Sequence, residues 1–158
     1  MNKGQSTVKY QQFLGFYLTP KIQVMLPTEN LAKIFKLELS NIVPIPDMSE
    51  AVVGVCPWQG EVLWLIDISY LLGFKPVLIP ENNQDKCYVL KVKNQEQTLG
   101  LLVYQVGQLV QCDVSQLQPV PLEKITPRLA PYYQTNWLHF QEKTLPILDI
   151  EAIQESIA

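Results

Sequence analysis

The sequence has few charged side chains and no cluster of lysine or arginine. Aspartate, glutamate, lysine and arginine together make up 17% of its 158 residues, and the formal net charge is −3. An average soluble domain is about one quarter charged. A surface that binds nucleic acid needs concentrated basic side chains, so this composition argues against that function. Sparse charge also leaves room for exposed apolar patches, through which proteins dock onto partners.

Long apolar runs are missing as well. No uninterrupted run approaches the roughly 18 residues that a membrane-spanning helix needs, so we expect no direct membrane insertion. The first residues are polar and lack the apolar segment of a signal peptide. We therefore expect a cytoplasmic protein in which residues 1–12 form a flexible N-terminus.

Cysteine is scarce and irregularly spaced. Cys56, Cys87 and Cys112 with His139 are the side chains that suggest zinc, but none of them has CxxC or HxxxC spacing. Cys56 and His139 could act as nucleophile and base, although no oxyanion motif or orienting Asn or Asp accompanies them. Phosphate-binding glycine loops and metalloprotease helices are absent too. We expect reduced, buried cysteines, no metal, no cofactor and no enzymatic activity.

The most informative stretch covers residues 52–74. It reads as a strand, a tight glycine turn, a second strand, a short capped helix and a glycine stop. Its latter half recurs at the end of the chain, where Leu-Pro-Ile-Leu-Asp-Ile at 145–150 matches Leu-Trp-Leu-Ile-Asp-Ile at 63–68. The repeat indicates a fold built from two related sub-barrels.

Asp67 and Asp149 occupy the same place in the two copies of this repeat. A pair of carboxylates can perform acid–base chemistry. Each of these aspartates, however, directly precedes an expected helix, where an aspartate side chain accepts a hydrogen bond from the first turn. We therefore assign both residues as structural helix caps.

Short β-rich segments separated by turns recur along the chain. We expect extended segments or strands at 13–18, 22–26, 42–46, 52–55, 62–66, 87–92, 98–103, 106–112, 137–140 and 144–148, and a C-terminal helix at 150–156. Frequent turns and 12 prolines favour small barrels over a parallel sheet with crossover helices. One segment breaks the pattern, because Leu31, Ile34 and Phe35 have the spacing of one helical face.

We expect one domain over residues 13–153. It would hold two intertwined sub-barrels, at approximately 13–75 and 86–150, with a polar, proline-containing linker between them. Residues 154–158 are the C-terminal end.

The ordered set of motifs resembles the chemotaxis coupling proteins, or CheW-like domains. The matching positions cover nearly the whole chain and are, in order, Pro46, Gly54-Val55, Gly60, Val62-Leu63, Leu65-Ile66-Asp67-Ile68, Leu72-Gly73, Gly100-Leu101-Leu102-Val103 and Ile147-Leu148-Asp149-Ile150. No single motif is specific, but the ordered set is.

The resemblance implies a mainly β fold of two intertwined, small, SH3-like, five-stranded β-barrels with short helices and a C-terminal helix. It implies a non-enzymatic adaptor that joins the cytoplasmic tip of a methyl-accepting receptor to the regulatory domain of a CheA-like histidine kinase. Such an adaptor is cytoplasmic and is recruited to membrane receptor arrays.

Several positions depart from the family pattern. The arginine of the family's turn falls at Gln59, its Asn-Leu pair at Pro57-Trp58, and its proline after the turn at Trp64. The aspartate that follows Gly-Leu-x-Val falls at Tyr104, and Lys33 lies near a position that is often acidic. The changes indicate a divergent member with its own partners, in a motility system such as phototaxis or twitching.

The resemblance and the exposed turn together suggest a partner interface, formed by Leu31, Lys33, Val53, Val55, Trp58, Gln59, Gly60 and Trp64. Trp58 has two interpretations: an exposed anchor, since tryptophan is enriched at interface hot spots, or a side chain folded back over the barrel end. Gly60 satisfies a turn that needs positive φ. Leu31, with Ile34 and Phe35, is either simple core or the border of a receptor groove.

The alternative function is a small-barrel module that binds nucleic acid. Such a module needs a basic groove with exposed stacking aromatics. The acidic net charge argues against it.

Overall fold

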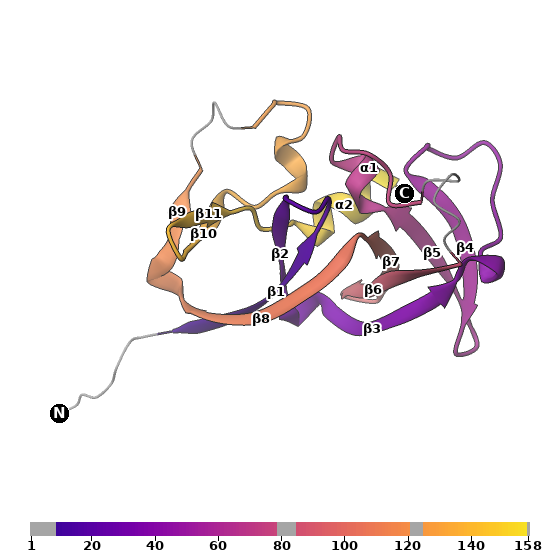
Figure 1. Ribbon diagram of the computed structural model, residues 1–158, viewed down its shortest axis with the longest axis horizontal. Helices are drawn as coiled ribbons and strands as arrows, with labels where there is room; N and C mark the ends of the chain where they lie inside the picture. The colour runs from indigo at the N-terminus through magenta and orange to yellow at the C-terminus, as the bar shows by residue number, and fades with distance from the viewer. Residues whose placement is uncertain (1–8, 79–84, 121–124, 158) are drawn as a thin grey trace.

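The computed structural model describes residues 9–78, 85–120 and 125–157, and strands dominate these ranges (Figure 1). The strands are β1 (Tyr10–Tyr17), β2 (Gln23–Pro27), β3 (Leu31–Glu38), β4 (Val52–Trp58), β5 (Glu61–Asp67), β6 (Lys86–Asn94), β7 (Gln97–Val103), β8 (Gln105–Asp113), β9 (Leu117–Pro119), β10 (Asn136–Phe140) and β11 (Lys143–Leu145). The helices are α1 (Ile68–Leu71) and α2 (Ile150–Ile157), and 3-10 turns lie at η1 (Thr28–Asn30), η2 (Leu39–Asn41), η4 (Val114–Gln116) and η6 (Ala130–Tyr132). No helix in the described ranges is long and apolar enough to cross a membrane. The mainly β architecture expected from the sequence is confirmed.

The strands form one five-stranded sheet and two three-stranded sheets. The five-stranded sheet has the order β3-β6-β7-β5-β4, and we call it the first barrel. The smaller sheets have the orders β2-β1-β8 and β11-β10-β9, and a bridge between Met25 and Ile147 joins them into the second barrel. β5 and β7 run parallel, and the other paired strands run antiparallel.

The two barrels take their strands from both halves of the chain. β1 and β2 open the chain, yet β1 pairs with β8, while β3 pairs with β6 (Figure 1). The first barrel therefore spans residues 31–103, and the second combines 10–27 with 105–145. The expected sub-barrels at 13–75 and 86–150 differ from this division, because neither of those two segments contains all the strands of one barrel.

Three apolar clusters stabilise this arrangement. One lies inside the first barrel and contains Leu63, Val89 and Leu102 among others. A second, around Phe13 and Leu138, fills the second barrel. The third and largest lies between the barrels and gathers buried side chains from β1, β2, β5, β6, β7 and both helices. Because β6 and β7 contribute to clusters on both faces, each contains consecutive buried apolar residues, Val89-Leu90 in β6 and Leu101-Leu102 in β7.

Two local expectations are corrected. The first strand begins at Tyr10 instead of Phe13, so residues 10–12 belong to β1. The rest of the expected flexible N-terminus, residues 1–8, and residues 79–84 of the expected linker lie outside the described residues. The segment from Leu31 to Phe35 is strand β3 and not a helix. Pairing with β6 decides this conformation, since a cross-strand ladder outweighs a weak local helical pattern.

The β4–β5 hairpin turns through Gln59 and Gly60 alone, because Trp58 pairs directly with Glu61. Both turn residues have positive φ, 48° for Gln59 and 81° for Gly60. This is the pattern of a type I′ turn, whose twist matches the twist of the flanking strands. The turn is shorter than expected, so Pro57 and Trp58 belong to β4 and not to the loop.

β4 is an edge strand, and the segment before it covers part of its free edge. Val43 and Val55 exchange two backbone hydrogen bonds, of 2.7 and 2.9 Å. This close approach requires a glycine at position 54, because an added Cβ would lie 2.3 Å from the carbonyl oxygen of Val43. Pro57, which has no N–H to donate, is compatible with the remainder of the edge.

The two glycines of this hairpin should respond differently to the same substitution. Gly60→Ala should lower the free energy of unfolding by about 1 kcal/mol, because nothing lies near the added methyl group and only backbone strain opposes it. Gly54→Ala should cost about 3 kcal/mol, because the Val43 segment must also move away and lose its hydrogen bonds. Urea unfolding followed by tryptophan fluorescence measures both values. Equal losses would contradict the close approach of Val43 to Gly54.

Candidate functional site

An apolar surface covers the outer face of the β4–β5 hairpin. In an antiparallel pair, directly opposed side chains share a face. Val55 opposes Trp64, Pro57 opposes Val62, and the alternate pair of Cys56 and Leu63 points into the first barrel. We call Val55, Pro57, Val62 and Trp64 the hairpin face. Val62 is 65% exposed and Trp64 is 36% exposed, so this face offers apolar area to a partner.

The hairpin face continues into a groove of about 440 Å³ between β5, β7 and the end of α2. Val62 and Trp64 form one wall, and the others come from β7, α2 and the loop before β4, with Leu99, Ile157 and Met48 as its further apolar members. None of the lining residues within the described part of the chain is charged. An uncharged groove suits an apolar protein partner and lacks the basic lining that a single-stranded nucleic acid needs.

Trp58 packs inward and not toward the hairpin face. Its ring stacks on that of Phe35 at 3.8 Å between centroids and 10° between planes, and the ammonium of Lys33 lies 5.9 Å from its centroid. Both aromatic rings pack against the cluster inside the first barrel. Since β3 and β4 are the two edges of the five-stranded sheet, this stack closes the barrel end. Of the two interpretations, the structure has Trp58 folded back over the barrel.

The remaining residues of the expected interface do not lie together in the structure. Leu31 packs against the cluster between the barrels, and Val53, next to an irregularity in the β4–β5 register, packs toward the inside of the first barrel. Gln59 and Gly60 are exposed at the hairpin tip, beside the hairpin face. Val53 therefore lies on the opposite side of the barrel wall from Trp64, and Leu31 is partly covered where the two barrels pack together.

Sequence reasoning missed Val62 and Pro57 as members of the surface. The alternation in Glu61-Val62-Leu63-Trp64 could have indicated Val62, because residues two apart in a strand share a face. Pro57 was assigned to a loop. The groove itself had no sequence signal, since Leu99 and Ile157 come from distant elements.

Asp67 caps α1 and also fixes the segment that follows the helix. Its carboxylate accepts hydrogen bonds from the N–H groups of Tyr70 (3.1 Å), Val77 (2.7 Å) and Leu78 (3.4 Å). The residue is only 3% exposed. Burial raises the pKa of Asp67, an effect that these N–H groups oppose by favouring the charged form.

Asp149 caps α2 in the corresponding place. Its Oδ1 accepts a hydrogen bond from the N–H of Ala152 at 3.0 Å, and its carbonyl oxygen accepts one from Ile153 at 3.1 Å. Each aspartate is therefore engaged by its own helix. This geometry gives no support to a shared role in acid–base chemistry.

The cysteines and His139 do not assemble into a reactive site. Cys56 lies inside the first barrel, whereas His139 is exposed on β10 of the second. Burial, with smaller effects from the charges of Asp67 and Cys56, raises the pKa of the Cys87 thiol to about 11. Within the described ranges, no group of three His, Cys, Asp or Glu side chains is arranged to hold a metal ion.

Comparison with known proteins places this geometry in a family. The model of the CheW-like domain family matches residues 12–158. The crystal structure of the scaffolding protein TtCheW from Thermoanaerobacter tengcongensis superposes with a TM-score of 0.74 at 17% identity, covering 89% of this chain and 90% of that one. At this identity the likeness shows the shared fold. No curated protein matches the sequence.

The two capping aspartates should differ in their contribution to stability. Asp67→Ala leaves three N–H groups without their acceptor at a buried site, so we expect a loss of about 3 kcal/mol in the free energy of unfolding. Asp149→Ala removes one cap at a helix end, so we expect a loss of about 1 kcal/mol. Urea unfolding of the two variants compares these values. A loss for Asp149→Ala as large as that for Asp67→Ala would contradict the assigned roles.

The raised pKa of Asp67 predicts a pH dependence. The folded state holds this proton more tightly than the unfolded chain does. The resulting stabilisation is therefore present below the unfolded-state pKa of about 3.9 and is lost as the pH rises through the folded-state value. The wild type should lose stability relative to Asp67→Asn as the pH is raised from about 4. Urea unfolding of both proteins across that range tests the expectation, and a constant difference would refute it.

Proposed function

Because this chain belongs to the CheW-like domain family, we propose that it is a non-enzymatic adaptor, which couples a chemoreceptor-type sensor to a chemotaxis-type histidine kinase. It works in the cytoplasm, at membrane receptor arrays, and controls taxis or motility. The observation that carries the proposal is the exposed, uncharged hairpin face with its adjoining groove. We assign this surface to the regulatory domain of the kinase.

The hairpin face has the properties of a docking site. Tryptophan and aliphatic side chains are exposed together, and Trp64 forms one wall of a groove into which a partner side chain can insert. The hairpin beneath it is held rigid by the Phe35–Trp58 stack and by the bridge to Val43. A rigid surface loses little entropy on binding, so more of the contact energy contributes to affinity.

An adaptor must hold its second partner on a different surface. We assign the receptor tip to the outer side of β3, where Ile34 is 40% exposed. Simultaneous binding would keep receptor and kinase at a high effective concentration in one array. The mechanism is then geometric, with no chemical step.

Alanine substitutions on the hairpin face should weaken kinase binding. We expect Trp64→Ala to raise the Kd for the purified regulatory domain of the kinase from the same cell more than about fivefold, which corresponds to about 1 kcal/mol. Val62→Ala should weaken binding less, because it removes less contact area. Leu109→Ala is the matched control, since Leu109 is 59% exposed but lies on β8 of the second barrel. Isothermal titration calorimetry gives the affinities, and thermal unfolding verifies that each variant is folded.

Two results would reject this assignment. If the folded wild type binds neither the kinase nor a methyl-accepting receptor from its own cell, the scaffold serves another purpose. If Leu109→Ala weakens kinase binding as much as Trp64→Ala, the kinase does not use the hairpin face.

A further inference from the structure

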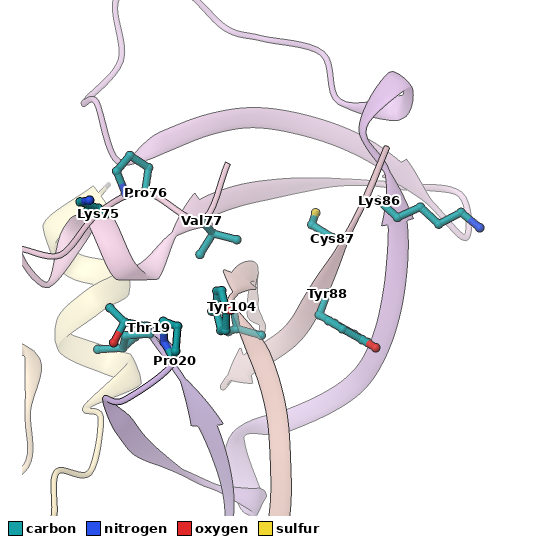
Figure 2. A pocket seen from close by; sticks show the side chains of 11 residues that line it. Thr19, Pro20, Lys75, Pro76, Val77, Lys86, Cys87, Tyr88 and Tyr104 are labelled. Atoms are coloured by element: carbon teal, nitrogen blue, oxygen red, sulfur yellow. The ribbon is translucent and has the colours of Figure 1, made fainter. Parts of the chain in front are cut away.

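A second pocket, of about 340 Å³, lies where the two barrels meet (Figure 2). We call it the inter-barrel pocket. Its walls are the turn between β1 and β2, the segment after α1, the start of β6, and the link between β7 and β8. Among the described residues, it shares none with the groove beside the hairpin face, so the two are separate sites.

The inside of the inter-barrel pocket is apolar. Val77, the sulfur of Cys87 and the ring of Tyr104 face a common space, and Pro20 and Pro76 border it (Figure 2). Cys87 and Val77 are buried, whereas Tyr104 is 47% exposed at the mouth. The volume of the inter-barrel pocket is at the lower end of the range for ligand pockets. It therefore suits one bulky side chain and not an extended molecule.

Lysines surround the mouth of this pocket. Lys75 and Lys86 belong to its lining, and Lys21 directly follows Pro20. The ammonium of Lys36 lies 5.2 Å from the ring centroid of Tyr88, which is another lining residue. The ammonium of Lys86 extends away from the cavity, so its charge lies outside the apolar space (Figure 2).

None of these lysines forms an ion pair with a carboxylate in the part of the chain that the structure describes. The one ion pair found there joins Lys91 to Glu61, on another part of the first barrel. Glu38 opposes Lys86 in the β3–β6 ladder without forming an ion pair.

Hydrogen bonds hold the pocket walls in place without a ligand. The N–H of Val77 donates to the buried carboxylate of Asp67 at 2.7 Å. The N–H of Tyr104 donates to the carbonyl oxygen of Tyr17 at 3.0 Å, and that of Leu18 to Ile22 at 2.9 Å. A preformed pocket costs little to organise on binding.

We propose that the inter-barrel pocket binds an acidic peptide segment that carries one bulky apolar anchor side chain. The anchor enters the space between Val77, Cys87 and Tyr104, and carboxylates on both sides of it face the surrounding lysines. Tyr104 stands where the family pattern has an aspartate. At that position an aspartate would place negative charge at the mouth and remove an aromatic wall, so this specificity belongs to the present chain and not to the family.

A selection from a library of random heptapeptides displayed on phage, with the full-length protein as bait, tests the proposal. We expect the enriched peptides to share one large apolar residue flanked by aspartate or glutamate. Synthetic copies of these peptides should bind at least about tenfold more weakly to the double variant Lys75→Glu/Lys86→Glu. Tyr104→Asp should weaken the binding of these peptides about fivefold or more. Added salt should weaken their binding to the wild type.

The matched control is the double variant Lys93→Glu/Lys143→Glu. It changes the net charge by the same amount at exposed sites that do not line this pocket. The peptides should bind this control within about twofold of the wild type, because its charges lie outside contact range. All the replaced lysines are exposed, so circular dichroism should show unchanged folds.

Three outcomes would overturn the proposal. The first is an absence of enrichment, or enrichment of neutral or basic peptides. The second is that acidic peptides bind both double variants equally weakly, which would indicate a general charge effect. The third is that dodecanoate or phosphatidylglycerol vesicles bind to the inter-barrel pocket and the acidic peptides do not. None of these depends on whether a kinase binds the hairpin face.

Discussion

Strands from the two halves of the chain pair with each other, and this pairing organises both barrels. β1 pairs with β8 and β3 pairs with β6, so each barrel needs strands from both halves. The largest apolar cluster lies between the barrels and forms only when both are assembled. Most of the buried apolar area is therefore gained together, which favours cooperative folding. The two candidate binding surfaces are consequences of the same pairing, because both are lined by elements distant in sequence.

Within this framework Asp67 connects several elements at one point. It ends β5, begins α1 and binds the N–H groups of Val77 and Leu78 after the helix. The carboxylate is buried, yet backbone donors surround it, which is how a polar group is tolerated in an apolar interior. The same contact positions Val77 in the wall of the inter-barrel pocket. A residue identified as a helix cap thus also supports a binding surface.

The candidate site shows how far local reasoning reaches. Alternation along β4 and β5 is sufficient to place Val55 and Trp64 on one face, and the glycine at position 60 indicates the turn. The direction of Trp58 could not be foreseen, because its partner Phe35 lies on β3, at the opposite edge of the sheet. Phe35 was itself assigned to a helical face, since its spacing from Leu31 fits both periods. Strand pairing with β6, a long-range effect, resolves that ambiguity.

The β-rich architecture, the hairpins, the two capped helices and the membership of the family follow from local sequence patterns. These features depend on neighbouring residues: alternation sets the strands, glycine with positive φ sets the turns, and an aspartate before an apolar run sets each cap. The fold as a whole sets which strands share a barrel, which tryptophan is exposed, and where apolar space and lysines meet. Those outcomes depend on contacts between segments far apart in the chain, for which a single sequence carries no local signal. Trp58 and Trp64 illustrate the difference: they are six positions apart on neighbouring strands and lie on opposite faces of one sheet.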